Sequence, residues 1–376
     1  MPHRTAPKRE ELPIMRKTLI ATTALAAAGA LAAGSASAAD MLSVGVGGYM
    51  QQWLGVSSVE DTANPATEGG IAQQSDSELF FRGKLEADNG LTVSVKIEIE
   101  GNTHASPVDE SQLTLGGEFG AITLGAEDGA SVLTHHGVRD AGFGMICGDF
   151  GSWINGIKGC GPGGMGTAGH GLGDKNNVTY FSPRVNGVQF GATYIPNIGQ
   201  EAQTAPLANN DADAWSVGGN YKGDFGGANV AASVGYYERS TDYNYTNFGL
   251  QVGMGAFNFD VAYAVSDNGA NDGANTDAVA AGAMYTDGPM AVSLSHTATE
   301  ADDGDEQSGT LLSMSYSLAP GVAWRSSLFA AERDRGSTAM KDVPSMAGDM
   351  NRGTKVSIAG TSVEGNGFVT GITVGF

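Results

Sequence analysis

Three basic residues at alternating positions of one predicted β-hairpin could do chemistry together. Arg82 and Lys84 lie on the first arm and Lys96 on the second, within the stretch LFFRGKLEADNGLTVSVKIEIE (79–100). A three-residue loop ending in a left-handed Gly90 places Arg82 opposite Lys96, and a shift by one more pair would place Lys84 there instead. Like charges directly opposite are destabilising, so the cluster calls for a functional explanation. Such a basic wall could set up an electric field across a narrow polar space.

Acidic residues that could face this wall come from one long glycine-rich segment, residues 129–175, and from its base. We expect them to line the other side of the space: Glu127, Asp128, Asp140 and Asp149. The alternative is a wall of neutralised pairs, in which Arg82 or Lys84 bonds to a nearby glutamate of its own hairpin, Glu86, Glu98 or Glu100.

Cysteine and histidine suggest a stiffened loop and no metal centre. The only two cysteines, Cys147 and Cys160, both fall in the long segment and are predicted to form a disulfide in an exported protein. No histidine spacing matches a structural zinc site, so we expect no cofactor. The acidic run 300–306 lacks the pattern of a calcium loop, which leaves only weak Ca²⁺ or Mg²⁺ binding at acidic loops as an alternative.

The elements that must position these residues are amphipathic strands. Apolar and polar residues alternate in segments of about ten residues, and the connections between them are short and long in strict alternation. That pattern predicts an all-β fold, a transmembrane antiparallel up-and-down β-barrel that closes because every backbone group must be paired in hydrocarbon. No helix is expected. We predict sixteen strands, at about 42–56, 77–87, 91–101, 110–117, 121–128, 176–182, 188–196, 213–222, 228–238, 245–254, 256–266, 277–286, 289–298, 308–318, 321–332 and 366–376.

Both chain ends carry signals. A signal peptide with an N-terminal extension is predicted over 1–38, with Met15 as the true start. Its features are the basic start Met15-Arg16-Lys17, an Ala/Leu-rich stretch and an A-x-A cleavage site ending at residue 38. The barrel is predicted over 39–376. The last strand ends on Phe376, read as a C-terminal strand signal, and we expect it to pair with the first strand. The strand-like stretch 355–358 is assigned to the last long loop, although eighteen strands is an alternative.

Four stretches resemble the general diffusion porins of Gram-negative bacteria, alphaproteobacterial type. They are LFFRGKLEADNGLTVSVKIEIEG, LTLGGEFGAITLG, DKNNVTYFSPRVNGVQFGATY and GFVTGITVGF. The resemblance implies sixteen strands, a homotrimer and a third extracellular loop folded into the lumen as a constriction. The chain departs from the family after ITLG (122–125), where Ala126-Glu127-Asp128 stands in place of a frequent arginine.

We therefore expect an outer-membrane porin that passes ions and small hydrophilic solutes by diffusion, without enzymatic activity. The acidic composition, Lys+Arg 20 against Asp+Glu 41, argues against nucleic acid as a partner and suggests a preference for cations. Expected partners are outer-membrane lipid and lipopolysaccharide, the latter bridged through divalent ions. The alternatives are a surface or adhesion protein and a barrel hydrolase.

Overall fold

The fold is seen in a computed structural model that describes residues 42–63, 69–101, 107–142, 150–158, 166–168, 175–199, 213–240, 243–267, 269, 275–336, 340–343, 354–357 and 360–376. The predicted signal peptide, 1–38, lies outside the described residues. None of the helices in the described part is long and apolar enough to cross a membrane.

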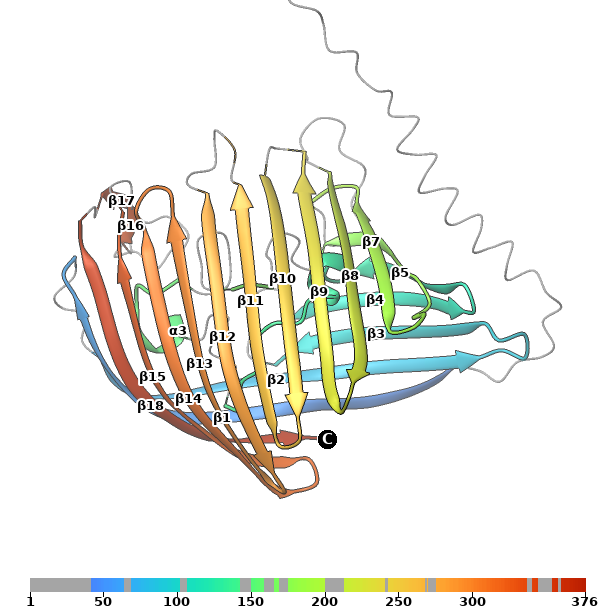
Figure 1. Cartoon of the computed structure of the whole chain (residues 1–376), viewed down its shortest axis with the longest axis horizontal. Helices are drawn as coiled ribbons and strands as arrows, with labels where there is room; N and C mark the ends of the chain where they lie inside the picture. The colour runs from blue at the N-terminus through green and yellow to red at the C-terminus, as the bar shows by residue number, and fades with distance from the viewer. Residues whose placement is uncertain are drawn as a thin grey trace, which may run out of the picture.

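Sixteen antiparallel strands close into one barrel (Figure 1). In chain order they are β1 (Ser43–Asp61), β2 (Gly70–Glu86), β3 (Thr92–Glu100), β4 (Val108–Gly117), β5 (Gly120–Ala126), β6 (Asn176–Phe181), β7 (Val188–Ile195), β8 (Ala214–Phe225), β9 (Ala228–Arg239), β10 (Tyr243–Met254), β11 (Phe257–Asp267), β12 (Thr276–Asp287), β13 (Met290–Ala301), β14 (Glu306–Ala319), β15 (Val322–Asp334) and β18 (Ser362–Gly375). The prediction of sixteen strands is confirmed.

The closing seam joins the two ends of the barrel. β1 pairs with β2 on one side and with β18 on the other, so both edge strands are satisfied. Phe376 exchanges backbone hydrogen bonds of 2.9 and 3.0 Å with Gly48 at the end of this seam. β16 (Met340–Val343) and β17 (Thr354–Ser357) form a separate hairpin, so the stretch near residue 355 stays out of the barrel as predicted.

The register of the first hairpin also matches the prediction. Arg82 pairs with Lys96, and Ala87 donates its N–H to Leu91 across the loop. Gly90 has a φ of 79°, a conformation that a residue with a side chain rarely adopts. The three-residue loop therefore fixes which side chains enter the barrel.

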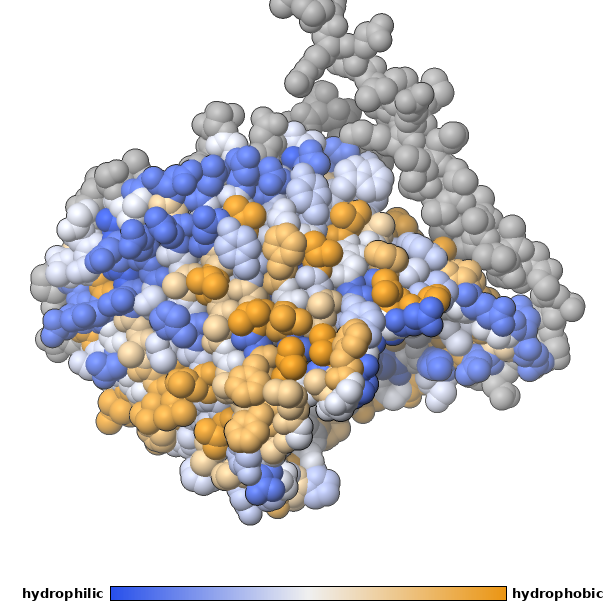
Figure 2. Space-filling view, viewed as in Figure 1, coloured by the Kyte–Doolittle hydropathy of each residue, from blue (hydrophilic) through white to orange (hydrophobic). Residues whose placement is uncertain are grey.

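The outer wall is apolar and the inner wall largely polar. Figure 2 shows a broad hydrophobic region on the lower part of the outer surface and a hydrophilic region above it. Exposed outward side chains include Leu54, Ile97, Phe248, Leu250, Val261, Leu294 and Leu312. Because their neighbours in each strand point inward, serine, threonine, asparagine and charged residues line the lumen.

Two findings differ from the sequence prediction. β1 and β2 extend several residues further at the long-loop end than expected, because polar residues there continue the ladder beyond the apolar region. Two single-turn helices, α2 (Ala130–Leu133) and α3 (Phe150–Trp153), occur where no helix was expected. Both lie in the long segment after β5, where contacts of α2 with β6–β9 and of Trp153 in α3 with Phe329 support turns too short to be stable alone.

Candidate functional site

The long loop after β5 folds into the barrel and follows its inner wall. Its backbone N–H groups donate to side-chain hydroxyls on four strands, and these hydrogen bonds anchor the loop to the wall. Four such bonds, each 2.8 Å long, run from Ala130 to Thr193, from Ser131 to Ser216, from His136 to Ser233 and from Ala141 to Ser293. The loop therefore crosses the lumen side of β7, β8, β9 and β13, which confirms the predicted infolded position.

The distal part of the loop packs into an apolar cluster inside the lumen. Trp153, which is 5% exposed, lies 6.5 Å from the ring of Phe329, and Ile154 is fully buried. Gly55 on β1 makes room for the indole, because a Cβ there would lie 2.6 Å from it. The full cluster comprises Trp53, Val59, Trp153, Ile154, Ile157, Leu311, Phe329, Ala331, Val363 and Val369.

Ion pairs hold the same part of the loop from the extracellular side. Asp305, in the connection between β13 and β14, accepts from Lys158 at 2.6 Å and from two nitrogens of Arg333 at 2.7 Å. These hydrogen bonds and the two positive charges lower the pKa of the Asp305 carboxyl despite its burial. The loop is thus attached to the wall over residues 130–141 and again over residues 153–158.

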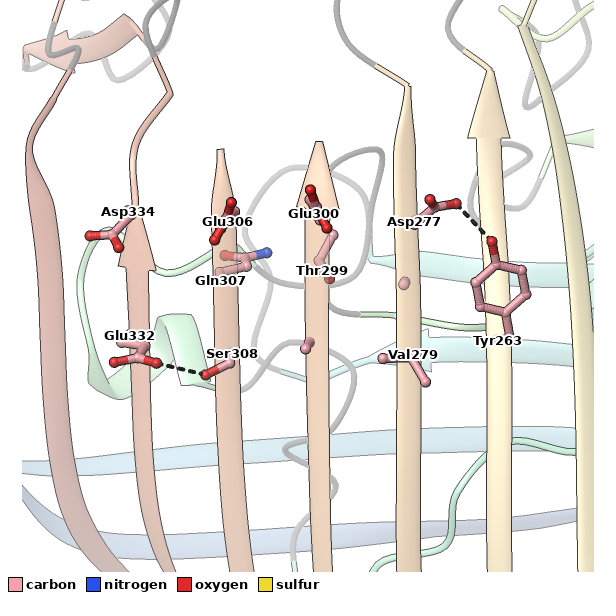
Figure 3. A pocket seen from close by; sticks show the side chains of 12 residues that line it. Tyr263, Asp277, Val279, Thr299, Glu300, Glu306, Gln307, Ser308, Glu332 and Asp334 are labelled. Atoms are coloured by element: carbon pink, nitrogen blue, oxygen red, sulfur yellow. Dashed lines mark hydrogen bonds between the residues drawn. The ribbon is translucent and has the colours of Figure 1, made fainter. Parts of the chain in front are cut away.

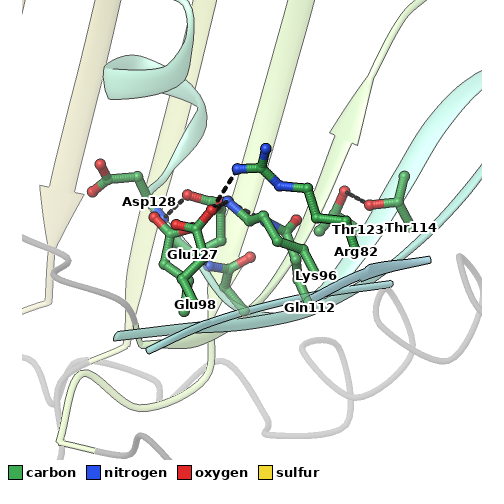
Figure 4. A network of polar contacts seen from close by, with 10 residues as sticks. Arg82, Lys96, Glu98, Gln112, Thr114, Thr123, Glu127 and Asp128 are labelled. Atoms are coloured by element: carbon green, nitrogen blue, oxygen red, sulfur yellow. Dashed lines mark hydrogen bonds and ion pairs between the residues drawn. The ribbon is translucent and has the colours of Figure 1, made fainter. Parts of the chain in front are cut away.

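Lys96 contacts three carboxylates instead of facing open solvent (Figure 4). Its Nζ lies 3.5 Å from Glu98 and 2.9 Å from Glu127, and it also donates to Glu110. The lysine side chain is 24% exposed and the three carboxylate side chains 16% or less. A lysine so enclosed acts as a counter-ion within an acidic cluster.

Arg82 and Lys84 also form ion pairs with glutamates of their own hairpin, as the alternative of a wall of neutralised pairs predicted. Arg82 donates to Glu98 at 2.9 Å and stacks over the ring of Phe80 at 4.2 Å. Lys84 lies 3.8 Å from Glu86, but its side chain stays 67% exposed. Lys84 is therefore the most accessible cation of the predicted basic wall.

The predicted acidic residues do not form one opposing wall. Glu127 lies beside Lys96 rather than across from it, because β5 returns next to β4, and Asp128 follows directly at the loop base. Asp140 accepts from Ser293 on β13 at 2.9 Å, far around the barrel. Asp149 and both cysteines of the predicted disulfide, Cys147 and Cys160, lie outside the described residues.

A second group of carboxylates lies on the same wall and was not singled out from the sequence. Ligand atoms of Glu78, Glu100 and Asp109 all lie within 4.8 Å of one another. Glu78 and Glu100 face one another across β2 and β3, two places further along the face that carries Lys96. The alternating pattern of the hairpin could have predicted that Glu78 and Glu100 face one another. The approach of Asp109 to this pair, in contrast, depends on a bulge between β3 and β4.

The opposite side of the lumen carries cations that the prediction also missed. β11 is eight strands from β3 in either direction around the closed barrel. There Asp260, which is 2% exposed, accepts the backbone N–H of Arg139 at 3.0 Å and two guanidinium nitrogens at 2.9 and 2.5 Å. Lys222 on β8 lines the same region. The lumen therefore has an acidic side at β2–β5 and a more basic side at β8–β11.

Two loop histidines are kept neutral by their surroundings. Burial, assisted by the neighbouring His136, lowers the pKa of His135 to about 4. Burial and the charges of Lys222, Arg184 and Arg139 lower the pKa of His136. Neither ring forms part of a metal-ligand cluster among the described residues. His296 on β13 faces outward, away from the lumen, beside Thr310.

A closed barrel with an apolar exterior, a charged lumen and an infolded loop defines a channel-forming transmembrane protein of the bacterial outer membrane. A family profile described as Gram-negative porin matches residues 21–337. The chain belongs to this family, and its function is that of an outer-membrane porin channel.

Solved porin structures show the same fold at low sequence identity. An anion-selective porin from Comamonas acidovorans has 19% identity and a TM-score of 0.59, with 89% of this chain and 100% of that chain covered. OmpT of Vibrio cholerae, solved in a trimer form, has 15% identity and a TM-score of 0.55 over 89% and 100%. A mutant of Rh. blastica porin has 14% identity and a TM-score of 0.51, again over 89% and 100%. No curated protein sequence matches the chain. The match to the porin family profile favours a channel over an enzyme.

Proposed function

We propose that this porin prefers cations among the ions and small hydrophilic solutes that diffuse through it. The observation that carries the proposal is the enclosure of Lys96 by Glu98, Glu110 and Glu127. Further carboxylates at Glu78 and Glu100 form no ion pair with any described lysine or arginine. The wall at β2–β5 therefore presents a net negative charge to solutes, which attracts cations and repels anions.

Removal of one of these carboxylates tests the preference. In Glu127→Gln the permeability ratio of K⁺ to Cl⁻ should fall about fourfold, since a unit charge about 10 Å away in water changes the energy of each ion by about 0.4 kcal/mol, in opposite directions for K⁺ and Cl⁻. The matched control is Glu364→Gln, an exposed residue of β18 on the outer face. Equal ratios in Glu127→Gln and the wild type, measured in planar bilayers, would contradict the proposal.

We also propose a homotrimer, with the outer face of β1 and β2 in contact with a second copy. Gln73 Nε2 donates to Gln52 Oε1 at 2.8 Å on this face, where β18 presents Ile372 at the level of Gln52. Amide side chains facing hydrocarbon are costly, so burial against protein is favoured. The purified protein should migrate as a trimer in unheated SDS gels. A monomer, with the barrel intact, would contradict the assembly.

Carboxylates on the outer rim are proposed to contact the lipid and lipopolysaccharide layer through weakly bound Ca²⁺ or Mg²⁺. Asp277, Glu300, Glu306 and Asp334 follow one another as directly paired residues of β12–β15, above the apolar surface. Figure 3 shows them on neighbouring strands, with Tyr263 donating to Asp277 at 2.8 Å. Lipopolysaccharide binding that is insensitive to a chelator would contradict this contact.

A further inference from the structure

A niche on the basic side of the lumen has the form of a binding site for small anions. It is a cavity of about 580 Å³ at the short-turn end of β8–β11, beneath the infolded loop. The residues that matter are Lys222, Arg139, His136 and the amides of Gln251, Asn229 and Asn258. We propose that this niche binds the oxyanion group of small solutes that carry a phosphate or a carboxylate.

The strand register builds the niche from two rows of side chains. In the upper row, Lys222, Ala231, Gln251 and Asp260 are successive paired residues of β8, β9, β10 and β11. Lys222 and the Asp260-bound Arg139 thus stand at the two ends, and the small Ala231 leaves space beside Gln251. Two cations on either side of a gap are suited to an oxyanion, because each can donate charge-assisted hydrogen bonds.

The lower row adds neutral donors around a second gap. Asn229, Gly253 and Asn258 are paired neighbours on β9, β10 and β11. A Cβ at Gly253 would lie 2.9 Å from Oδ1 of Asn258, so the glycine keeps the space between the two amides open. Amide groups orient a bound oxyanion without adding charge.

The two cations retain capacity for a ligand. Asp260 engages Nε and Nη2 of Arg139, while Nη1 forms no hydrogen bond with a described residue, and the side chain is 35% exposed. Lys222 forms no ion pair within the described part of the chain and is exposed to the lumen. Asp224 also lines the cavity and accepts the N–H of Gly227 at 3.1 Å within its own turn, and its negative charge offsets part of the positive charge of the niche.

The loop covers the niche and completes it. Gln251 donates to the carbonyl of Gly137 at 2.6 Å, and a Cβ at Gly249 would meet the carbonyl of His136 at 2.0 Å. Arg184 approaches from the neighbouring turn, where it donates to Asn220 at 2.7 Å. Burial, together with the positive charges of Lys222, Arg184 and Arg139, lowers the pKa of the His136 ring.

Inorganic phosphate is the probe for the test. Phosphate added at constant ionic strength to single channels in KCl should reduce the current in a saturable way, since it occupies the conducting lumen. In Lys222→Gln the apparent affinity should fall about fivefold, the effect of one charge contact at about 4 Å in water. Lys222→Arg should retain the affinity, and Lys84→Gln, which removes a lumen lysine from the β2 wall, should leave it within about twofold.

The inference rests on the lumen being the conducting path. Different results would contradict the channel and the anion-binding niche. A folded protein that passes no KCl current would contradict the channel. Conducting wild-type channels that show no saturable effect of phosphate would overturn the niche, as would an equal loss of affinity in Lys84→Gln and Lys222→Gln.

Discussion

Replacement of Lys96 by methionine tests the reading of this lysine as a counter-ion. The substitution keeps the length of the side chain and removes the charge that Glu98, Glu110 and Glu127 surround. Because all four side chains are at least three-quarters buried, removal of the partner leaves carboxylates in a poorly solvated place. We expect a loss of barrel stability of about 3 kcal/mol, the lower end of the cost of breaking a buried ion pair.

Selectivity should change in the same variant. Loss of one positive charge about 10 Å from the solute path should raise local cation concentration roughly twofold, so the K⁺/Cl⁻ permeability ratio should rise. Zero-current potentials in a KCl gradient measure the ratio, and the unfolding midpoint in urea measures the stability.

Lys84→Met is the matched control for stability. Its side chain is 67% exposed and has one carboxylate at 3.8 Å, so little stability should be lost. The selectivity should still shift towards cations, because Lys84 carries the same charge in the same wall. Equal stability losses in the two variants, or a Lys96→Met barrel as stable as the wild type, would refute the counter-ion role.

Three further predictions concern the loop and the first turn. Trp153→Ala should release the distal loop, lower the stability by about 3 kcal/mol and produce additional current sublevels. A variant whose open-channel noise equals that of the wild type would argue against the apolar anchor. His135 is protonated at a higher pH in the unfolded chain than in the folded one, because its pKa is lower in the folded protein. The stability should therefore be full above about pH 6.5 and should decline towards pH 4 by up to about 3 kcal/mol. Melting measured at several pH values should show a smaller decline for His135→Gln. Gly90→Ala should cost about 1 kcal/mol through its positive φ, and an unchanged unfolding midpoint would contradict the turn assignment.

The strands and the first hairpin could be predicted because their information is local. Alternation decides which face of a strand is apolar, and a three-residue loop with Gly90 decides the pairing of Arg82 with Lys96. The closing of β18 on β1 followed from the need to pair both edges. Extensions such as Val59–Asp61 were missed because polar residues above the apolar surface look like loop.

The arrangement of charges could not be predicted from the same information. Glu110 reaches Lys96 from β4 across a register shift, and Glu127 reaches it from the end of β5. Sequence spacing placed Glu127 across the lumen, whereas the position of β5 beside β4 brings it alongside. The contact between Arg139 and Asp260 joins residues 121 positions apart, and it exists only because the loop follows the inner wall.

The most direct test of the charge assignment is the zero-current potential of the wild-type channel across a KCl gradient. The carboxylate-rich wall around Lys96 predicts a potential whose sign shows K⁺ permeating faster than Cl⁻. A potential of the opposite sign, with Cl⁻ permeating faster, would contradict the account.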